Sequence, residues 1–259
     1  HTSLVSDWSS DVCSSDLSYP ERRSAQRWML ERTIYSGQAR PDLLIAPSHW
    51  LADRLSVGPT KVIRNAVTPV AGIKSRTGHS TPVRFGFISN PVHDPRKGLH
   101  RLGPVLEAFA KRFGPVELHL FGKGSEQGVA FGAQVSVHSH PAFNPKEIGR
   151  VYSQFDILLC PSLKDNSPNV VTEALSFAVP VIAQVGTGMD TYVEEPFGAL
   201  IDFRDSAADA GARAIGRLVA DYPAASAAAL QFAQKDLSPE RIGRQYLSAY
   251  SELLDRQAH

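Results

Sequence analysis

Cysteine is scarce in this 259-residue chain, the charge is nearly balanced, and long hydrophobic runs are absent. Two cysteines, Cys13 and Cys160, give no disulfide framework, which favours a reducing, cytoplasmic compartment. A formal net charge of +1 supplies no strong field for nucleic acid, so we expect no nucleic-acid partner. Apolar stretches stay below the ~18 residues that span a bilayer, and no secretory signal is visible. The hydrophobic content of 42% still suffices for a core, so we expect a globular protein.

The first seventeen residues lack the pattern of a folded segment. Residues 7–17 show no apolar periodicity and look like the translation of a common sequencing adapter. We therefore interpret residues 1–17 as an assembly artefact and leave them out of the fold. A disordered polar terminus is the alternative. Because the chain begins with His1 rather than Met, we also expect a truncated N-terminus.

Short apolar strands alternate with helices in most of the chain. This alternation predicts βαβ units and a parallel sheet that is covered on both faces. The expected strands are 83–89, 116–121, 134–138, 155–160 and 179–183. The expected helices are 99–113, 145–153, 168–178, 206–221, 224–235 and 239–254.

The N-terminal part has its own elements. A helical pattern covers 18–37, and short strands are expected at 42–47 and 61–65, with Ser48 capping a short helix between them. Residues 68–81 are rich in Pro, Gly, Ser and Thr and read as a linker. We divide the chain accordingly into residues 18–72, residues 80–238 and a C-terminal helix at 239–259.

One polar loop follows the buried strand that ends at Cys160. It carries Asp165, and Ser167 is expected to cap the next helix with Pro168 in the first helical position and Asn169 after it. Free N–H groups at a helix N-terminus bind phosphate. Ligands of open parallel sheets bind beyond the carboxyl ends of the strands, where this loop lies.

Glu173 lies further along the same helix, among apolar residues. A buried carboxylate is costly unless it is paired or hydrogen-bonded, and a sugar diol would satisfy it. The alternative is a partly exposed glutamate that benefits from the helix dipole. The residues alone favour neither interpretation.

A second loop follows the strand at 83–89 and contains Arg96, Lys97 and Gly98. A departing nucleoside diphosphate develops negative charge that fixed cations stabilise. Taken alone, Arg96 and Lys97 are better explained as a solvated surface pair.

The two loops together resemble the donor site of family 4 (group 1) retaining glycosyltransferases. That family carries two acidic residues eight positions apart, and Asp165 and Glu173 have this spacing, although the family usually has Glu at the first position. The resemblance implies that Asp165, or a backbone group beside it, meets the hydroxyls of the donor sugar. It also implies that Glu173 binds the ribose and that Lys97 pairs with the diphosphate. The arginine that the family has five positions before its lysine corresponds to Val92 here, and Arg96 is the candidate substitute.

The resemblance covers about residues 40–254 and implies the fold and the function. The expected fold is α/β, a Rossmann-like parallel sheet of a two-lobed (GT-B type) glycosyltransferase whose N-terminal lobe is mostly missing. The expected reaction moves a sugar from a nucleotide-diphosphate sugar to an acceptor glycan, lipid or small molecule with retention, as in polysaccharide biosynthesis. It needs no cofactor and no metal. The missing lobe would make any peripheral contact with the inner face of the membrane, and we expect this chain to be inactive by itself.

Other functions remain as alternatives. A non-catalytic nucleotide-sugar or glycan-binding module and a nucleotide-sugar epimerase of similar architecture would share these features. A dinucleotide oxidoreductase is disfavoured because no Gly-x-Gly-x-x-Gly follows the first strands. A metal site at His138 and His140 is disfavoured too, because no acidic or Cys partner stands nearby at ligand spacing in the sequence.

Overall fold

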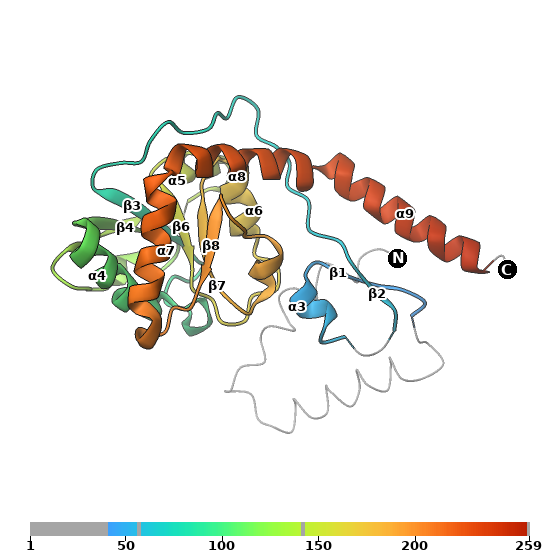
Figure 1. Cartoon of the computed structure of the whole chain (residues 1–259), viewed down its shortest axis with the longest axis horizontal. Coiled ribbons are helices and arrows are strands. Elements are labelled where there is room, and N and C mark those ends of the chain that lie inside the picture. The colour runs from blue at the N-terminus through green and yellow to red at the C-terminus, as the bar shows by residue number, and fades with distance from the viewer. Residues whose placement is uncertain (1–40, 56–57, 141–142, 258–259) are drawn as a thin grey trace, which may run out of the picture.

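The computed structural model describes residues 41–55, 58–140 and 143–257. The predictions for residues 1–17 and for a helix over 18–37 lie outside this range. Within it, the chain forms a large α/β unit and a small two-stranded sheet. The large unit lies beyond the N-terminal end of the long C-terminal helix α9, Pro239–Gln257, and the small sheet lies alongside this helix (Figure 1).

A six-stranded parallel sheet forms the centre of the large unit. Its strands are β3 (Val83–Ile88), β4 (Val116–Phe121), β5 (Val135–His140), β6 (Ile157–Cys160), β7 (Val181–Gln184) and β8 (Gly198–Ile201). They are ordered β5-β4-β3-β6-β7-β8, and every pair is parallel. Counted from β3, this is the 3-2-1-4-5-6 order of the Rossmann fold, whose direction of growth reverses between β3 and β6. The predicted parallel α/β sheet is therefore confirmed.

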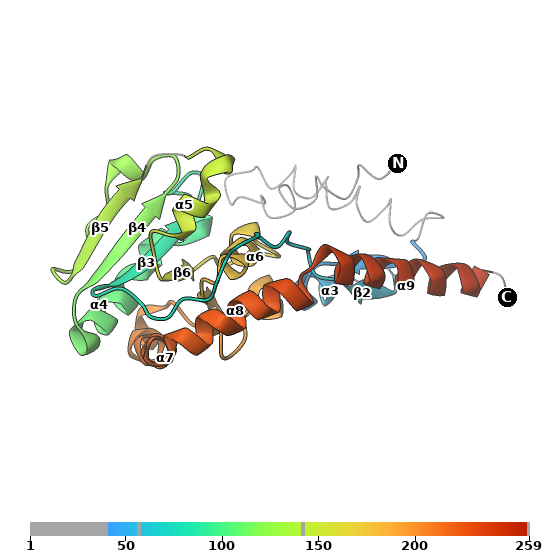
Figure 2. The same cartoon turned by 90° about the horizontal axis from the view of Figure 1, so that it is seen from above.

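Helices cover both faces of this sheet (Figure 2). They are α4 (Leu102–Phe113), α5 (Ile148–Tyr152), α6 (Asn169–Ser176), α7 (Ala208–Ala220) and α8 (Tyr222–Asp236). Helices α4 and α7 pack on one face, α5 and α6 pack on the other, and α8 runs along α6. Helix α4 buries Leu102, Val105, Leu106 and Phe109, the side chains that its periodicity predicts.

Strand β8 was not predicted, and several boundaries differ by about two residues. Its four residues, Gly-Ala-Leu-Ile, are too few to show the alternation that identifies a strand. It forms because Gly198–Ile201 lies in register with β7, Val181↔Gly198 to Gln184↔Ile201. The pattern of apolar residues within β8 itself carries no information about its pairing with β7.

The small sheet pairs β1 (Leu44–Ala46) with β2 (Thr60–Val62) in parallel and carries the short helix α3 (His49–Ala52). Ser48 caps this helix as predicted, since its Oγ accepts the N–H of Leu51 at 3.2 Å. Helix α9 packs against this sheet, where Ile242 and Ala249 form a small core with Ile63. Among the described residues, no helix combines the length and the hydrophobicity required to cross a bilayer.

Candidate functional site

A cavity of about 390 Å³ lies at the carboxyl ends of β3, β4 and β6, where the strand order reverses. This is the position at which doubly wound sheets bind their ligands. The lining comprises residues 87–90, Lys97, Phe121, Gly122, Phe143, residues 159–162, Asp165 and residues 168–170. Four of the predicted site residues are among them: Lys97, Asp165, Pro168 and Asn169.

Lys97 and Asp165 come from different loops and meet in this cavity. The Nζ of Lys97 lies 2.8 Å from Oδ2 of Asp165, with the side chains 39% and 17% exposed. The segment that carries Lys97 is anchored on the carbonyl of Pro161, at the start of the Asp165 loop. A Cβ on Gly98, whose φ is +77°, would come within 2.7 Å of this oxygen, and Arg101 Nη1 donates to it at 2.9 Å. The close approach explains why glycine follows Lys97.

The loop that follows β7 holds the backbone of the segment around Asp165. The N–H of Gly188 donates to the carbonyl of Asp165 at 2.8 Å, and a Cβ on Gly188 would lie 1.7 Å from the carbonyl oxygen of Asn166. Thr187 and Asp190 form a capping box at the start of the short helix Gly188–Thr191. The position of Asp165 is therefore set by backbone contacts and by Lys97 together.

The N-terminus of α6 lines the cavity through Pro168, Asn169 and Val170. The helix starts at Asn169, so Pro168 occupies the N-cap position and not the predicted first helical position. The prediction that Ser167 caps this helix is wrong, because its side chain makes no capping hydrogen bond there. The first residues of α6 nonetheless line the cavity at the strand ends, where the N-terminus of a helix favours an anion.

Ser167 instead joins a hydrogen-bond network around Tyr192, which is fully buried. Ser167 Oγ donates to Tyr192 Oη at 2.7 Å and accepts from Asn65 Nδ2 at 2.9 Å. Tyr192 Oη donates to the carbonyl of Pro47 at 2.8 Å and accepts the N–H of Asn65 at 2.9 Å. Burial raises the pKa of Tyr192. The network ties the small sheet to the loop that carries Asp165.

Glu173 is half-buried and has a protein partner. Tyr152 Oη donates to Glu173 Oε2 at 3.0 Å and lies 3.2 Å from the carbonyl oxygen of Val170. Burial, followed by the charge of Glu173, raises the pKa of Tyr152 well above its usual value. Glu173 is not part of the cavity lining, but Val170, one turn earlier on the same side of α6, is. Within the described residues, Oε1 of Glu173 accepts no hydrogen bond.

Arg96 lies apart from the other candidates. Its Nη2 is 2.7 Å from Oδ2 of Asp94, and its side chain is 45% exposed and outside the cavity lining. The hydrogen bond from Arg96 lowers the pKa of Asp94. The structure therefore brings Lys97, and not the adjacent arginine, to the cavity.

Sequence reasoning did not single out Tyr152, Tyr192 or Asn65 as site residues. Tyr152 supports Glu173 from another helix, and Tyr192 and Asn65 support Ser167 from positions far along the chain. Cys160, at the end of the buried strand β6, is a free thiol and forms part of the cavity wall.

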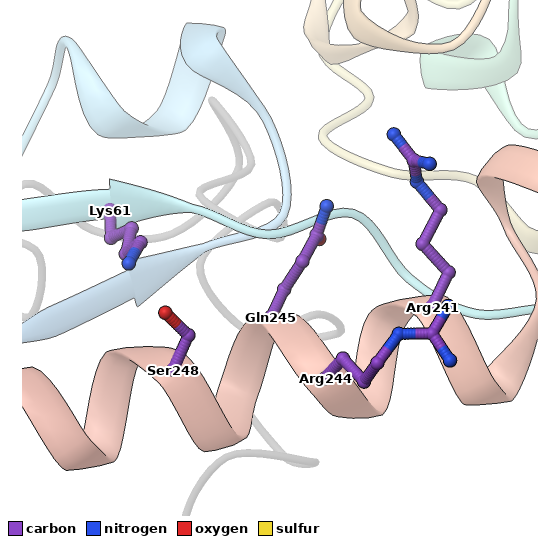
Figure 3. Close-up of a pocket in the computed structure, with 5 residues that line it drawn as sticks. All are labelled: Lys61, Arg241, Arg244, Gln245 and Ser248. Carbon is purple, nitrogen blue, oxygen red and sulfur yellow. The ribbon is translucent and has the colours of Figure 1, made fainter.

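A second cavity, of about 270 Å³, lies between β2 and α9 (Figure 3). Its lining residues are Lys61, Arg241, Arg244, Gln245 and Ser248. Lys61 pairs with Glu252 at 2.8 Å, and Arg241 pairs with Asp236 at 3.3 Å. It contains none of the predicted site residues and lies away from the strand ends.

The expectation that no acidic partner accompanies His138 and His140 is wrong in three dimensions. Parallel pairing of β4 with β5 brings Glu117 and His119 beside them, and Glu117, His119 and His138 form a group able to hold a metal ion. The group cannot be recognised from spacing in the sequence, because Glu117 and His119 belong to β4 whereas His138 and His140 belong to β5. Burial lowers the pKa of His119 and of His140.

Comparison with solved structures shows the same fold in several glycosyltransferases of the GT-B type. Sucrose-phosphate synthase from Thermosynechococcus elongatus is 22% identical, with a TM-score of 0.65 over 95% of this chain and 66% of that one. The pneumococcal O-GlcNAc transferase GtfA, in complex with UDP and GlcNAc, is 17% identical, with a TM-score of 0.62 over 85% and 47%. Anabaena HepE, in complex with UDP and glucose, is 19% identical, with a TM-score of 0.63 over 91% and 69%. The chain thus spans about half to two thirds of the length of these proteins.

Sequence comparison gives a family as well. No curated protein matches the chain. The model of the family described as glycosyl transferases group 1 matches residues 82–221, which include the whole six-stranded sheet and both loops of the cavity. This match covers more than half of the chain, and the sheet order and the neighbouring structures agree with it. The chain belongs to the group 1 glycosyltransferases.

Proposed function

We propose that this chain binds the nucleotide-diphosphate sugar donor of a retaining glycosyl transfer in the cavity at the strand ends. One observation carries the proposal: Lys97 and Asp165 meet in a cavity that the N-terminus of α6 also lines. A cation, a carboxylate and free backbone amides are then available within one small volume. A donor needs these groups for its diphosphate and its sugar.

The diphosphate would lie against Lys97 and the first amides of α6. A lysine ammonium and a helix N-terminus both stabilise negative charge, and the half-exposed Lys97 side chain is accessible to a ligand. The negative charge that develops on the leaving diphosphate is met by the same groups. We therefore propose transfer without a metal or another cofactor.

The sugar and the ribose would be held by the two carboxylates. Asp165 lines the cavity beside Lys97 and can accept hydroxyl protons of the donor sugar. Glu173 lies one turn beyond the lining residue Val170, and its Oε1 is available for a ribose hydroxyl while Oε2 is held by Tyr152. Asn169 and Pro168 shape the cavity wall between them, and Ser167 fixes the loop through Tyr192.

Positioning and charge stabilisation would lower the barrier, and neither carboxylate acts as a nucleophile. The complexes of GtfA with UDP and GlcNAc and of HepE with UDP and glucose support the class of donor. We propose a glycan or lipid-linked acceptor, a place in polysaccharide biosynthesis, and a cytoplasmic protein with peripheral contact at the inner face of the membrane.

The donor contacts lie in residues 80–238, and we propose that residues 18–72 belong to the acceptor side. Since the chain spans 47% of GtfA and 66% of the synthase, residues 1–259 alone are expected to bind a nucleoside diphosphate without turning over a donor.

A thermal-shift panel of UDP, GDP, ADP and dTDP tests the proposal. A ligand at about 100-fold excess over its Kd stabilises the fold by about 2.7 kcal/mol. This corresponds to a rise in Tm of about 5–10 °C for a domain of this size. Lys97→Ala should abolish most of the shift, whereas Lys111→Ala, an exposed lysine of α4, should leave it unchanged. No shift with any nucleotide, or equal shifts in both variants, would contradict the proposal.

A further inference from the structure

Four titratable side chains share one face of the sheet at its β5 edge. Glu117 and His119 are two residues apart in β4, and His138 and His140 are two residues apart in β5. The side chains of each pair therefore point to the same face of the sheet. The parallel register places His119 directly opposite His138. The cluster is therefore a product of strand pairing.

Its atoms are close enough to share a ligand. Nε2 of His119 lies 3.2 Å from Oε2 of Glu117, and the rings of His119 and His138 stack with centroids 4.8 Å apart. One ligand atom each from Glu117, His119 and His138 can be chosen so that all three lie within 4.8 Å of one another. Two imidazole nitrogens and one carboxylate oxygen thus lie close to one another.

We propose that Glu117, His119 and His138 bind a divalent transition-metal ion, with Zn²⁺ as the first candidate. Tetrahedral Zn²⁺ holds its nitrogen and oxygen ligands at about 2.0–2.2 Å, which puts neighbouring ligand atoms about 3.4 Å apart. The ligand atoms, which lie within 4.8 Å of one another, must approach by up to about 1.4 Å to reach this spacing. His138 can supply this approach by rotation, since it is exposed on an edge strand.

The ligand set selects the class of ion. Imidazole suits Zn²⁺, Cu²⁺ and Ni²⁺, whereas Mg²⁺ and Ca²⁺ prefer sites made of oxygen alone. Three protein ligands leave one tetrahedral position for water, which reaches the site past the exposed His138. The site is therefore an open one.

His140 would orient the imidazole ring of His119, the buried residue that binds the metal. Its Nε2 lies 3.0 Å from Nδ1 of His119. When Nε2 of His119 binds the metal, Nδ1–H of the same ring donates to His140, which fixes the tautomer and the orientation of the ring. His140 is thus a positioning residue, and His119 is the ligand.

Two neighbouring groups define the surroundings. Arg84 pairs in register with Glu117 and opposes a cation there, but Asp156 lies 3.9 Å from Arg84 and offsets its charge. The His140 ring stacks on Phe121 at 4.3 Å, and Phe121 is a wall of the donor cavity. The metal site thus lies behind that wall and takes no part in the proposed transfer.

Isothermal titration of the full chain with Zn²⁺ in a chelator-free buffer tests the proposal, with Co²⁺ as a spectroscopic probe. We expect one saturable site per chain and visible d–d absorption of bound Co²⁺. His138→Gln and Glu117→Gln should each raise the Kd at least 10-fold, and His140→Gln should raise it about 10–100-fold, the usual effect of losing an orienting partner. These variants spare the buried His119, whose replacement could unfold the chain.

His100→Gln is the matched control, because His100 is an exposed histidine outside the cluster. It should leave both the Kd and the Co²⁺ spectrum unchanged. Absence of a one-to-one site, or a Kd that responds to His100→Gln as strongly as to His138→Gln, would overturn the proposal. Nucleotide binding is measured separately, so failure here is distinguishable from failure of the donor site.

Discussion

The ammonium of Lys97 and the carboxylate of Asp165 lie 2.8 Å apart, and each is the ionic partner of the other in the candidate donor cavity. A diphosphate that takes up Lys97 must therefore share or displace this contact. The pair makes the cavity less positive than a lone lysine would. In the proposed donor site, Asp165 would therefore oppose the phosphates while it accepts hydroxyl protons of the sugar.

Asp165→Asn should separate these two effects. Removing one negative charge beside Lys97 should tighten binding of the free nucleoside diphosphate several-fold, because like charges a few ångströms apart repel by about 1–4 kcal/mol. The gain for the matching nucleotide sugar should be smaller, because a carboxylate acceptor for its hydroxyls is lost. Titration calorimetry with both ligands measures the two effects. Asp209→Asn, an exposed change on α7, is the control, and weaker diphosphate binding by Asp165→Asn would argue against our placement of the phosphates.

Glu173→Ala tests the assignment of the ribose. If Glu173 accepts ribose hydroxyls, the wild-type chain should prefer a ribonucleoside diphosphate over its dideoxy analogue by about 10-fold or more, the worth of a charge-assisted hydrogen bond of about 1.5–3 kcal/mol. In Glu173→Ala this preference should vanish. Glu126→Ala, which replaces an exposed glutamate, should retain it. A preference that survives in Glu173→Ala would remove this residue from the site.

The sequence alone predicted those parts of the fold that depend on local pattern. Strand β4 has its expected extent and helix α4 ends at Phe113 as expected, because the apolar spacing and the glycines that follow, Gly122 and Gly114, are local features of the sequence. The loop residues Lys97 and Asp165 could be placed at one site because parallel strands all end on the same edge of a sheet. The family resemblance sharpened this expectation, and the match over residues 82–221 supports it.

The missed features depend on partners that are distant in sequence. Ser167 has the position and chemistry of a helix cap, but its hydroxyl forms hydrogen bonds with Asn65 and Tyr192 instead. The cluster proposed to bind a metal was not predicted, because Glu117 and His138 become neighbours only through the register of β4 and β5. No local rule encodes either choice.

Tyr192→Phe should loosen the small sheet. The substitution deletes one donated and two accepted hydrogen bonds of a fully buried hydroxyl. Each typical bond contributes about 1 kcal/mol, and the stranded partners add a desolvation cost, so we expect a loss of about 1–3 kcal/mol in the free energy of unfolding. Urea denaturation measures this loss, and hydrogen exchange should accelerate at the amide of Asn65. Tyr250→Phe, at an exposed position of α9, should change neither measurement.

Tyr222 should make stability depend on pH in the alkaline range. Its hydroxyl is buried and donates to the carbonyl of Asp156 at 3.0 Å, and burial raises its pKa to about 12. The pKa of an unfolded tyrosine is about 10, so the phenol ionises more readily in the unfolded chain. The contribution of this group is therefore fully present below pH 10 and is lost as the pH rises through 12, by about 2.7 kcal/mol in all. Tyr222→Phe should be the less stable protein at pH 9, and its deficit relative to wild type should shrink by about 2 kcal/mol by pH 12. Urea titrations of both proteins across this range provide the measurement, and a deficit that stays constant would show that Tyr222 ionises equally in both states.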